Sequence, residues 1–489
     1  MDYDVIIIGA GIVGTSLARE LTKYRTRVLV LEKEADVSMG ATKANSAIVH
    51  GGYAEKHSTL KGKLCYQGRT QFRKLDEELN FGFRESGALV MTFEDKREIL
   101  EMLLGNGRQN GLTDLRIIDS EEIRKMEPAL NPDVRYALYC EGAGVCSPYG
   151  MCIAMAENAV MNGASLELSS EVTEIEKEGD RFLVRTDRAE YRSRFVVNAA
   201  GVHSDRVSKM AGVGGFRILP RSGEYLLFAR GTGEPIHSVI FQLPTKFGKG
   251  VLLTSTYYGN LLIGPDARDE EEKEDTSTHM ERVAEILRQS KVLYDGINPM
   301  QFIRSFTGIR ARSSTEDFII EETDVKGFVN AAGIQSPGLT ASPAIAQMLV
   351  GILKEAGLDL VPNEHFNPYR KPVVAYRKLK PLKEVQHLID MPEGNPERIV
   401  CRCEQVTEAE IVDALHREVP VRTVDGVKRR TRASMGWCQG DFCKKRIIGI
   451  MERELGLEID PSFDIEHSGV SRVGKSELVE YLKGIKEEE

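Results

Sequence analysis

Apolar and polar segments alternate at the start of the chain in an order that predicts a strand, a helix and a second strand. Residues 4–8 (DVIII) form a short run rich in β-branched residues, which is typical of a buried parallel strand. Residues 15–24 (TSLARELTKY) place Leu17 and Leu21 one helical turn apart, on one apolar face. Residues 27–33 (RVLVLEK) again favour a buried strand. This order predicts a βαβ unit in a parallel sheet.

The first strand leads directly into the sequence GAGIVG, which has the spacing of a dinucleotide-binding loop. Gly9 permits the tight turn, Gly11 lets the backbone approach a pyrophosphate, and Gly14 lets the helix pack close to the sheet. The helix N-terminus faces the phosphates. Glu32, at the end of the second strand, is placed to accept hydrogen bonds from ribose hydroxyls. The motif predicts a bound dinucleotide without separating FAD from NAD.

Farther along the chain the pattern changes to short alternating stretches. Residues 225–230 (YLLFAR), 250–264 (GVLLTSTYYGNLLIG) and 317–322 (DFIIEE) suit an antiparallel sheet. Residues 371–398 are rich in proline, lysine and glutamate, which predicts a linker. Residues 456–489 predict a short charged helix in a C-terminal tail.

Composition limits the class of protein. A chain of 489 residues is expected to form two or three domains, and 41% apolar and 28% charged residues are typical of a globular protein. The formal net charge of −9 argues against a nucleic-acid binder. No apolar run reaches the length of a membrane span, and the N-terminus lacks the pattern of a signal peptide. We therefore expect a cytoplasmic protein, either free or peripheral to the membrane, with no transmembrane segment.

Eight cysteines in a reducing compartment are not expected to form disulfides. Four of them are clustered: Cys401 and Cys403 are separated by one residue, and Cys438 and Cys443 follow. Four thiolates can hold a 2Fe–2S cluster or a structural zinc ion, and the spacing alone does not choose between them. Basic residues before the second pair either offset the charge of a cluster or form a solvated face; they are Lys428, Arg429, Arg430 and Arg432. The other cysteines are expected to be buried small apolar residues; they are Cys65, Cys140, Cys146 and Cys152.

Several motifs in residues 1–370 resemble the FAD-dependent oxidoreductases of the D-amino-acid oxidase and glycerol-3-phosphate dehydrogenase superfamily. They are GATKANSAIVHGGY (40–53), EVTEI (171–175), FVVNAAGVHSD (195–205) and GFVNAAGIQSPGLTASPAIA (327–346). The resemblance implies that the dinucleotide is FAD. The glycine motif and the resemblance together assign FAD binding to Gly9, Gly11, Ile12, Gly14, Glu32, Lys33, Thr42, Asn45, Ser46, Val172, Gly201, Gly333, Ser336, Gly338, Leu339 and Thr340.

The resemblance also implies two catalytic residues. In the superfamily, the arginine of a Gly-x-Arg motif pairs with an anionic substrate, and here that residue is Arg310, which follows Gly308. The alternative is a surface arginine paired with Glu316. His50 follows the hydroxyl-rich segment and is expected beside the flavin, with general base or covalent flavin attachment as further roles and a structural histidine as the alternative. Three nearby residues either line the same pocket or belong to a helix face; they are Tyr53, Lys61 and Lys63.

The sequence motifs do not decide between the substrates of two branches of this superfamily. The sequence NSAIVHGGY…STLKGKL resembles both glycerol-3-phosphate dehydrogenases and L-2-hydroxyglutarate oxidases or dehydrogenases. Membrane-associated glycerol-3-phosphate enzymes have Arg-Tyr after His-Gly-Gly, where this chain has Tyr53-Ala54. They also have Gly-Gly-Lys near the last flavin strand, where this chain has Gly333-Ile334-Gln335. The first departure removes one expected phosphate ligand, and both weaken a direct transfer of the phosphate site.

The cysteine-rich region resembles bacterioferritin-associated ferredoxins, which carry a 2Fe–2S cluster. The resemblance rests on CRCEQVTEAEI and KRRTRASMGWCQGDFC, and it implies that Cys401, Cys403, Cys438 and Cys443 bind the cluster. The same domain is fused to glycerol-3-phosphate and opine dehydrogenase subunits. It therefore favours oxidation of glycerol 3-phosphate to dihydroxyacetone phosphate by FAD, with electrons passed through the cluster to a partner in a hetero-oligomer. That partner would be an NAD-reducing flavoprotein subunit or a quinone-linked carrier.

Three alternatives stay open: a 2-hydroxy acid such as L-2-hydroxyglutarate as substrate, a non-catalytic electron-transfer subunit, and a zinc-stabilised domain that only docks partners. The expected fold is an α/β FAD-binding Rossmann-type domain, an α+β substrate domain with an antiparallel sheet, and a small all-α iron–sulfur domain. The expected boundaries are 1–81, 141–214 and 326–370 for the FAD-binding domain, 82–140 and 215–325 for the substrate domain, 371–398 for the linker, 399–455 for the 2Fe–2S domain and 456–489 for the tail.

Overall fold

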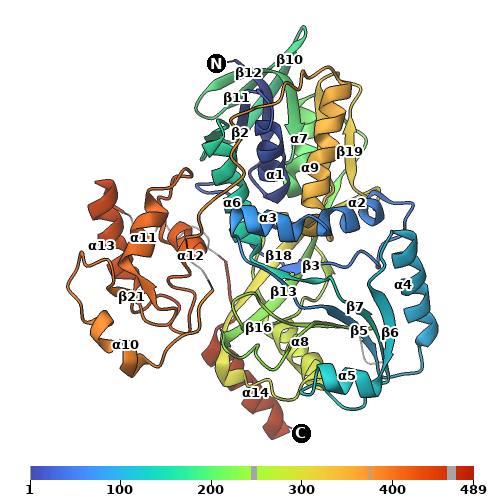
Figure 1. Ribbon diagram of the computed structural model, residues 1–489, viewed down its shortest axis with the longest axis vertical. Coiled ribbons are helices and arrows are strands. Elements are labelled where there is room, and N and C mark those ends of the chain that lie inside the picture. Colours follow the sequence, from blue (N-terminus) through green and yellow to red (C-terminus); the bar gives the residue numbers. More distant parts are fainter. Residues whose placement is uncertain (1, 244–250, 374–375, 460–469, 489) are drawn as a thin grey trace.

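Two large sheets and a small helical lobe make up the molecule (Figure 1). The structure is a computed structural model that describes residues 2–243, 251–373, 376–459 and 470–488. We call the part built on the first sheet the nucleotide domain, the part built on the second sheet the antiparallel domain, and residues 399–455 the cysteine domain.

The nucleotide domain is built on an eight-stranded sheet in the order β10-β11-β12-β1-β2-β9, with β20 beside β12 and β19 beside β20. β1 pairs in parallel with both β2 and β12. The strands are β1 (Asp2–Ile8), β2 (Val28–Leu31), β9 (Ser165–Glu167), β10 (Val172–Glu178), β11 (Arg181–Thr186), β12 (Glu190–Asn198), β19 (Ile319–Glu322) and β20 (Phe328–Ala332). The helices are α1 (Ile12–Thr22), α2 (Leu60–Arg69), α3 (Phe72–Leu79), α6 (Pro148–Met161), η1 (Gly201–His203), α7 (Ser204–Met210) and α9 (Gly338–Glu355).

Helices cover both faces of this sheet, which explains the continuous apolar run of β1. Val5 and Ile7 join the core under α1, α6 and α9, whereas Ile6 and Ile8 join a second core on the opposite face, against α7. A strand buried on both faces needs apolar residues at consecutive positions. The predicted βαβ unit and parallel sheet are confirmed.

The antiparallel domain contains a nine-stranded sheet in the order β17-β13-β16-β15-β14-β5-β7-β6, with β18 paired along β13. Only the β14–β5 pair among the pairings of these strands is parallel. The strands are β5 (Ala88–Thr92), β6 (Leu115–Asp119), β7 (Tyr136–Cys140), β13 (Ile218–Arg230), β14 (Val239–Gln242), β15 (Leu252–Ser255), β16 (Asn260–Ile263), β17 (Arg268–Asp269) and β18 (Phe302–Ser313). The helices are α4 (Arg97–Gln109), α5 (Ser120–Met126), α8 (Met280–Leu293) and η2 (Pro299–Gln301). The predicted antiparallel sheet is confirmed.

Two segments lie in a different sheet from the one the sequence suggested. β19, expected in the substrate domain, pairs with β20 in the sheet of the nucleotide domain. β4 (Phe83–Glu85), also expected there, pairs with β8 (Gly144–Cys146), which pairs with β3 (Ile48–Val49) in a small sheet. Alternating apolar residues suit either sheet, because the pattern identifies a strand without identifying its partner.

The cysteine domain is predominantly helical, as predicted, and adds a two-stranded ribbon that the sequence analysis did not foresee. Its elements are β21 (Ile399–Cys401), β22 (Val406–Thr407), α11 (Glu408–Leu415), α12 (Val424–Thr431) and α13 (Lys444–Leu455). The expected linker contains α10 (Leu382–Ile389), whose Val385 and Ile389 pack against Ile399. Figure 1 shows this lobe to one side of the molecule, with α12 facing the two large domains.

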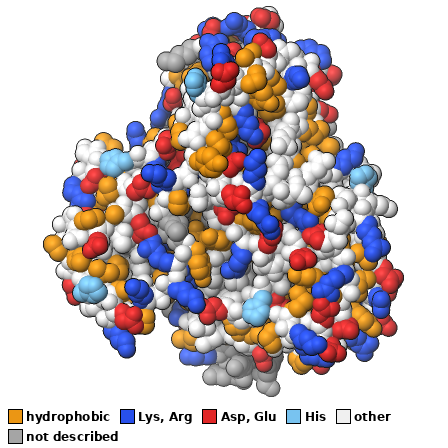
Figure 2. Space-filling view, in the orientation of Figure 1, with side chains coloured by type: hydrophobic (Ala, Val, Ile, Leu, Met, Phe, Trp, Pro, Cys, Tyr) orange, Lys and Arg blue, Asp and Glu red, His pale blue; other side chains and the backbone are white. Residues whose placement is uncertain are grey.

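The C-terminal tail returns to the antiparallel domain and ends in α14 (Lys475–Glu488). The Val473 amide donates to Thr278 Oγ1 at 2.8 Å, and Ser305 Oγ donates to the Val473 carbonyl at 3.0 Å. Leu478 is fully buried in the apolar core that contains Phe302. The described helices include none that is long and apolar enough to cross a membrane. Figure 2 shows basic and acidic side chains interspersed over one face of the molecule.

Candidate functional site

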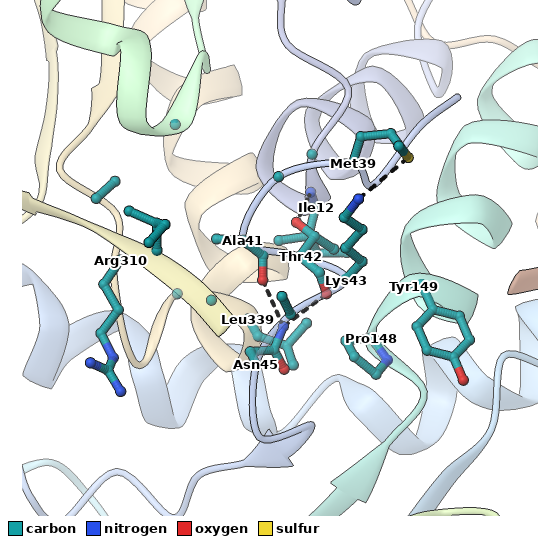
Figure 3. A pocket seen from close by; sticks show the side chains of 18 of the residues that line it. Ile12, Met39, Ala41, Thr42, Lys43, Asn45, Pro148, Tyr149, Arg310 and Leu339 are labelled. Carbon is teal, nitrogen blue, oxygen red and sulfur yellow. Dashed lines mark hydrogen bonds between the residues drawn. The ribbon is translucent and has the colours of Figure 1, made fainter. Parts of the chain in front are cut away.

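A cavity of about 950 Å³ lies between the nucleotide domain and the antiparallel domain. Figure 3 shows part of it, with Arg310 on one side and Lys43 and Tyr149 on the other. Most of the residues assigned to FAD from the sequence line this cavity: Gly9, Gly11, Ile12, Glu32, Lys33, Thr42, Asn45, Ser46, Val172, Gly201, Ser336, Gly338 and Leu339. His50 and Arg310 line it too.

The glycine loop at the end of β1 approaches its neighbours more closely than a side chain would allow. Gly9 has φ +107°, and a Cβ atom there would lie 2.5 Å from the Ala199 carbonyl oxygen. Gly14 does not line the cavity. A Cβ atom at this position would lie 2.0 Å from the Gly9 carbonyl oxygen, so the lack of a side chain on Gly14 lets α1 start against the loop. The first turn of α1 therefore faces a space that a backbone-bound pyrophosphate can enter.

Glu32 lies at the cavity wall with both carboxylate oxygens engaged by backbone amides. It accepts hydrogen bonds from the Ala10 amide at 2.7 Å and the Glu34 amide at 3.0 Å. Burial raises the pKa of this carboxyl above its usual range, against the opposing effect of the two amides. Each oxygen keeps accepting capacity for a ribose hydroxyl. The donor set fits the adenosine end of FAD.

Residues 40–50 cross the cavity as a chain held by its own hydrogen bonds. Asn45 Nδ2 donates to the Ala41 and Thr42 carbonyls, as Figure 3 shows, and Asn45 Oδ1 accepts from the Ala47 amide at 2.7 Å. β18 passes so close to this chain that a Cβ atom on Gly308 would lie 1.9 Å from the Ala44 carbonyl oxygen. The glycine of the Gly-x-Arg motif is therefore required by packing.

His50 is held from both its backbone and its ring. Its amide donates to Thr340 Oγ1 at 2.9 Å, its Nε2 lies 3.3 Å from Ser336 Oγ, and its ring stacks on Phe241. Burial lowers the pKa of His50 to about 4, so the imidazole is neutral at neutral pH. Thr340 does not line the cavity, and neither does Gly333; Thr340 instead positions the backbone of His50.

Arg310 projects from β18 with two of its donors on backbone carbonyls. Nη1 donates to the Ser222 carbonyl at 3.0 Å and Nη2 to the Asp266 carbonyl at 3.3 Å. Behind it, Arg282 Nε bonds Asp266 at 2.6 Å and Arg282 Nη2 bonds Ser222 Oγ at 2.9 Å. Glu316, the alternative partner considered from the sequence, pairs with Arg312. Arg310 is therefore a cation on the cavity wall that a rigid network orients.

The three neighbours of His50 that were considered for the pocket do not line it. Tyr53 is buried, Lys61 donates to the Glu316 carbonyl and lies over the Phe318 ring, and Lys63 is exposed.

The four clustered cysteines form two pairs on the loops of the cysteine domain. The Cys403 and Cys438 sulfur atoms are 3.3 Å apart. A hydrogen bond between the Cys401 and Cys443 thiols raises the pKa of Cys401 and lowers that of Cys443. Two pairs of thiolates suit a 2Fe–2S cluster, in which two ligands serve each iron, better than one tetrahedral zinc ion.

Backbone amides point at these sulfur atoms because the surrounding loops adopt left-handed conformations. Arg432, Ser434 and Gln439 have φ values of +70°, +75° and +48°. The amides of Glu404 and Ser434 donate to Cys401, and Ser434 Oγ lies 3.3 Å from Cys443 Sγ. Hydrogen bonds to sulfur stabilise the negative charge of a thiolate-bound cluster. The loop geometry therefore fits the cluster that the sequence implied.

The basic run at α12 is not the solvated face that was one alternative from the sequence. Arg429 and Arg430 are buried and both pair with Asp36 of the nucleotide domain, at 2.9 Å and 2.8 Å. Burial alone would raise the pKa of Asp36, but Arg430 and Arg429 outweigh that effect and hold the pKa at about 2. The run therefore docks the cysteine domain onto the nucleotide domain. Asp36 was missed because nothing around it in the sequence marks an interface.

Arg432 docks the cysteine domain onto the antiparallel domain. Its Nε donates to Glu404 at 2.9 Å, its Nη2 donates to Asn260 Oδ1 at 3.2 Å, and its guanidinium lies 4.0 Å from the centre of the Tyr258 ring. Arg230 of β13 also pairs with Glu404, at 3.3 Å. Glu404 follows a cluster cysteine directly, so this contact joins the cluster loop to the second sheet.

Docking makes the cysteine domain part of the cavity wall. Five of its residues line the cavity: Lys428, Arg429, Arg432, Met435 and Gln439. Cys438 lies between the last two in the sequence, and Tyr149 Oη of the nucleotide domain lies 3.6 Å from Met435 Sδ. The cluster ligands and the cavity are therefore separated by one short loop.

Comparison with known proteins agrees with this geometry. Residues 4–352 match the family described as "FAD dependent oxidoreductase", and residues 399–453 match the "BFD-like [2Fe-2S] binding domain". A "Glycerol 3-phosphate dehydrogenase" of Caloramator mitchellensis is 44% identical over 96% of this chain and 97% of the relative. An "L-2-hydroxyglutarate dehydrogenase, mitochondrial" of Bos taurus is 31% identical, but over 54% of this chain and 61% of the relative.

The fold also matches a solved structure. The dithionite-reduced L-α-glycerophosphate oxidase of Mycoplasma pneumoniae, with FAD bound, superposes with a TM-score of 0.72 at 29% identity. The match covers 76% of this chain and 98% of the oxidase. The resemblances seen in the sequence are thus confirmed. The chain belongs to the FAD-dependent oxidoreductases, and its C-terminal region is a BFD-like [2Fe–2S]-binding domain.

Proposed function

We propose that this chain is a cytoplasmic FAD-dependent dehydrogenase that oxidises sn-glycerol 3-phosphate to dihydroxyacetone phosphate. Electrons would leave through the [2Fe–2S] cluster to a separate partner protein. The glycerol-3-phosphate dehydrogenase relative supports the substrate, because it aligns along nearly the whole chain. The hydroxyglutarate relative aligns with only about half of it. The observation that carries the relay is that residues beside a cluster ligand line the FAD cavity.

Bound FAD supplies a two-electron acceptor for the hydride from C2 of the substrate, and the cluster accepts the electrons singly. His50 is neutral and can take the proton of the C2 hydroxyl at Nε2, beside Ser336 Oγ. Loss of that proton and that hydride turns the C2 carbinol into a carbonyl. Arg310 would bind the phosphate through the donors left over from its two carbonyl contacts.

We place the phosphate contact in the antiparallel domain, because the nucleotide domain departs from the family at the positions where phosphate ligands were expected. Tyr53 stands in place of an arginine and is buried away from the cavity. Ile334 and Gln335 line the cavity without supplying a charge. Arg310 is then the cation through which this chain would discriminate an anionic substrate from a neutral polyol.

The substrate and the relay are tested together by an anaerobic titration. Glycerol 3-phosphate is expected to bleach the flavin absorbance and to produce the electron paramagnetic resonance signal of a reduced 2Fe–2S cluster. Reduction by L-2-hydroxyglutarate alone would reassign the substrate. Reduction by dithionite but by neither substrate would indicate a non-catalytic subunit, and zinc in place of iron would exclude the relay.

Removing the docking charge should uncouple the two redox sites. Asp36→Asn leaves Arg430 buried without a counter-charge, and breaking such a pair costs about 3–5 kcal/mol. We expect faster proteolysis within residues 371–398 and cluster reduction slowed at least about ten-fold. Flavin reduction by substrate is expected to persist. Asp4→Asn, which removes a surface partner of Arg27, is the matched control. Unchanged cluster reduction in Asp36→Asn would refute the docking role.

The pH dependence of kcat/KM tests His50 as the base. Burial depresses its pKa to about 4, and only the neutral imidazole can accept a proton. The acid limb of the profile is therefore expected near pH 4, well below the ordinary histidine value of about 6.5. His50→Gln should remove this limb and lower kcat by about 10²–10⁴-fold. His57→Gln is the control, because His57 bonds Asn110 outside the cavity. An unchanged profile in His50→Gln would exclude the base role.

Truncation of Arg310 tests the anionic anchor. Arg310→Ala should lower kcat/KM for glycerol 3-phosphate by about 10²–10⁴-fold, since each bond to a charged group contributes about 1.5–3 kcal/mol. Arg312→Ala should stay near wild type, because Arg312 pairs with Asp269 and Glu316 and does not line the cavity. FAD content is measured in each variant by absorbance. Full turnover by Arg310→Ala would instead support the non-catalytic alternative.

A further inference from the structure

The cysteine domain exposes an aromatic residue next to a cluster ligand. Trp437, the single tryptophan of the chain, is 57% exposed. It precedes Cys438, which is partly exposed, whereas the other three clustered cysteines are buried. A partner's redox group could therefore approach the cluster most closely at this point.

Two arginines stack on the rings of Trp437 and Phe442. The Arg402 guanidinium lies 5.3 Å from the centre of the Trp437 ring and 4.4 Å from that of Phe442. Arg446 lies 4.2 Å from the Phe442 ring, and Lys445 beside it is exposed. We call Arg402, Trp437, Phe442, Lys445 and Arg446 the Trp437 face.

The cations of this face differ from the inner cations of the same domain. Arg429, Arg430 and Arg432 each pair with a carboxylate. Within the part of the chain that the structure describes, Arg402, Lys445 and Arg446 have no carboxylate within ion-pair distance. Stacking on rings holds these guanidiniums in place without using their donors.

The α13 helix dipole disfavours the positive charges at the start of this helix when no partner is bound. Lys445 and Arg446 lie in the first turn of α13, where the helix dipole disfavours positive charge by about 0.3–1 kcal/mol per residue. The negative cluster offsets part of this cost. Carboxylates of a docked protein would offset the rest.

We infer that the Trp437 face is the docking surface for an acidic electron-carrier protein. This inference rests on the proposed function in one respect, namely that the cluster passes electrons onward. Trp437 would be the aromatic anchor of the interface, and the three cations would select an acidic face on the partner. The reduced cluster gives up one electron, and the oxidised one-electron centre of the partner takes it. An anionic membrane fits less well, because a single exposed aromatic residue gives little area to bury in lipid.

The test uses one carrier in two charge states. Native cytochrome c is basic, and cytochrome c with succinylated lysines is acidic, while the haem is the same. The full-length protein is reduced chemically, freed of reductant and mixed with each carrier in a stopped-flow instrument. The chain carries a formal net charge of −9, so its overall field favours the basic carrier. Faster reduction of the acidic carrier would therefore show that the local charge of the Trp437 face, rather than the net charge of the chain, determines the rate.

We expect the acidic carrier to react about ten-fold faster than the basic one at low ionic strength, with the difference lost at about 0.5 M salt. Lys445→Glu should abolish the preference, and Trp437→Ala should slow reduction of the acidic carrier at every salt concentration. Lys291→Glu is the matched control, an exposed cation near the end of α8. The cluster reduction potential should be the same in all variants if the cations serve docking.

Each other outcome overturns the inference. An equal or faster reaction of native cytochrome c, or of neither carrier, would exclude an acidic partner at this face. A shifted cluster potential in Lys445→Glu would assign the cations to the cluster. Binding to phosphatidylglycerol vesicles that Lys445→Glu abolishes would assign the face to a membrane. Chemical reduction keeps this test independent of the substrate, so failure of glycerol 3-phosphate to reduce the cluster would count against the proposed function alone.

Discussion

The buried ion pairs of Asp36 with Arg429 and Arg430 determine how this molecule is assembled. A carboxylate and two guanidiniums removed from water are stable only while each has its partner. The contact therefore fixes α12 against the nucleotide domain and brings Met435 and Gln439 into the cavity wall. Arg432 and Glu404 fix the same lobe to the second sheet. The distance between the two redox sites follows from these few charges.

Close backbone approach shapes the rest of the site. Gly9 packs against Ala199 within the nucleotide domain, and Gly308 against Ala44 brings the two large domains together at the segment that ends in His50. Thr340 then holds the His50 backbone from α9, and the network of Arg282 orients Arg310 from below the strand. His50 and Arg310 come from different domains, so their relative placement depends on the packing between those domains.

Local motifs made much of the fold and site predictable from the sequence. Gly9 and Glu32 stand in a motif whose chemistry can be inferred from its own spacing, and the family resemblance pointed to His50 and Arg310, which line the cavity. The basic run on α12 could not be interpreted, because its partner Asp36 lies nearly 400 residues away and sequence spacing carries no information on that contact. Sequence spacing also gave no information on two other long-range contacts. These are the packing of the tail against the core around Phe302 and the pairing of β19 in the first sheet. Chemistry carried by neighbouring residues was predictable, whereas contacts across the fold were not.

The central claim is that FAD and the cluster form one electron-transfer unit within a single chain. The most direct measurement is the rate of cluster reduction after rapid mixing with glycerol 3-phosphate, followed by freeze-quench electron paramagnetic resonance at several protein concentrations. Transfer within one docked molecule predicts a first-order rate that does not change when the protein is diluted. A rate that falls in proportion to protein concentration would mean that electrons pass between molecules, and it would contradict the account.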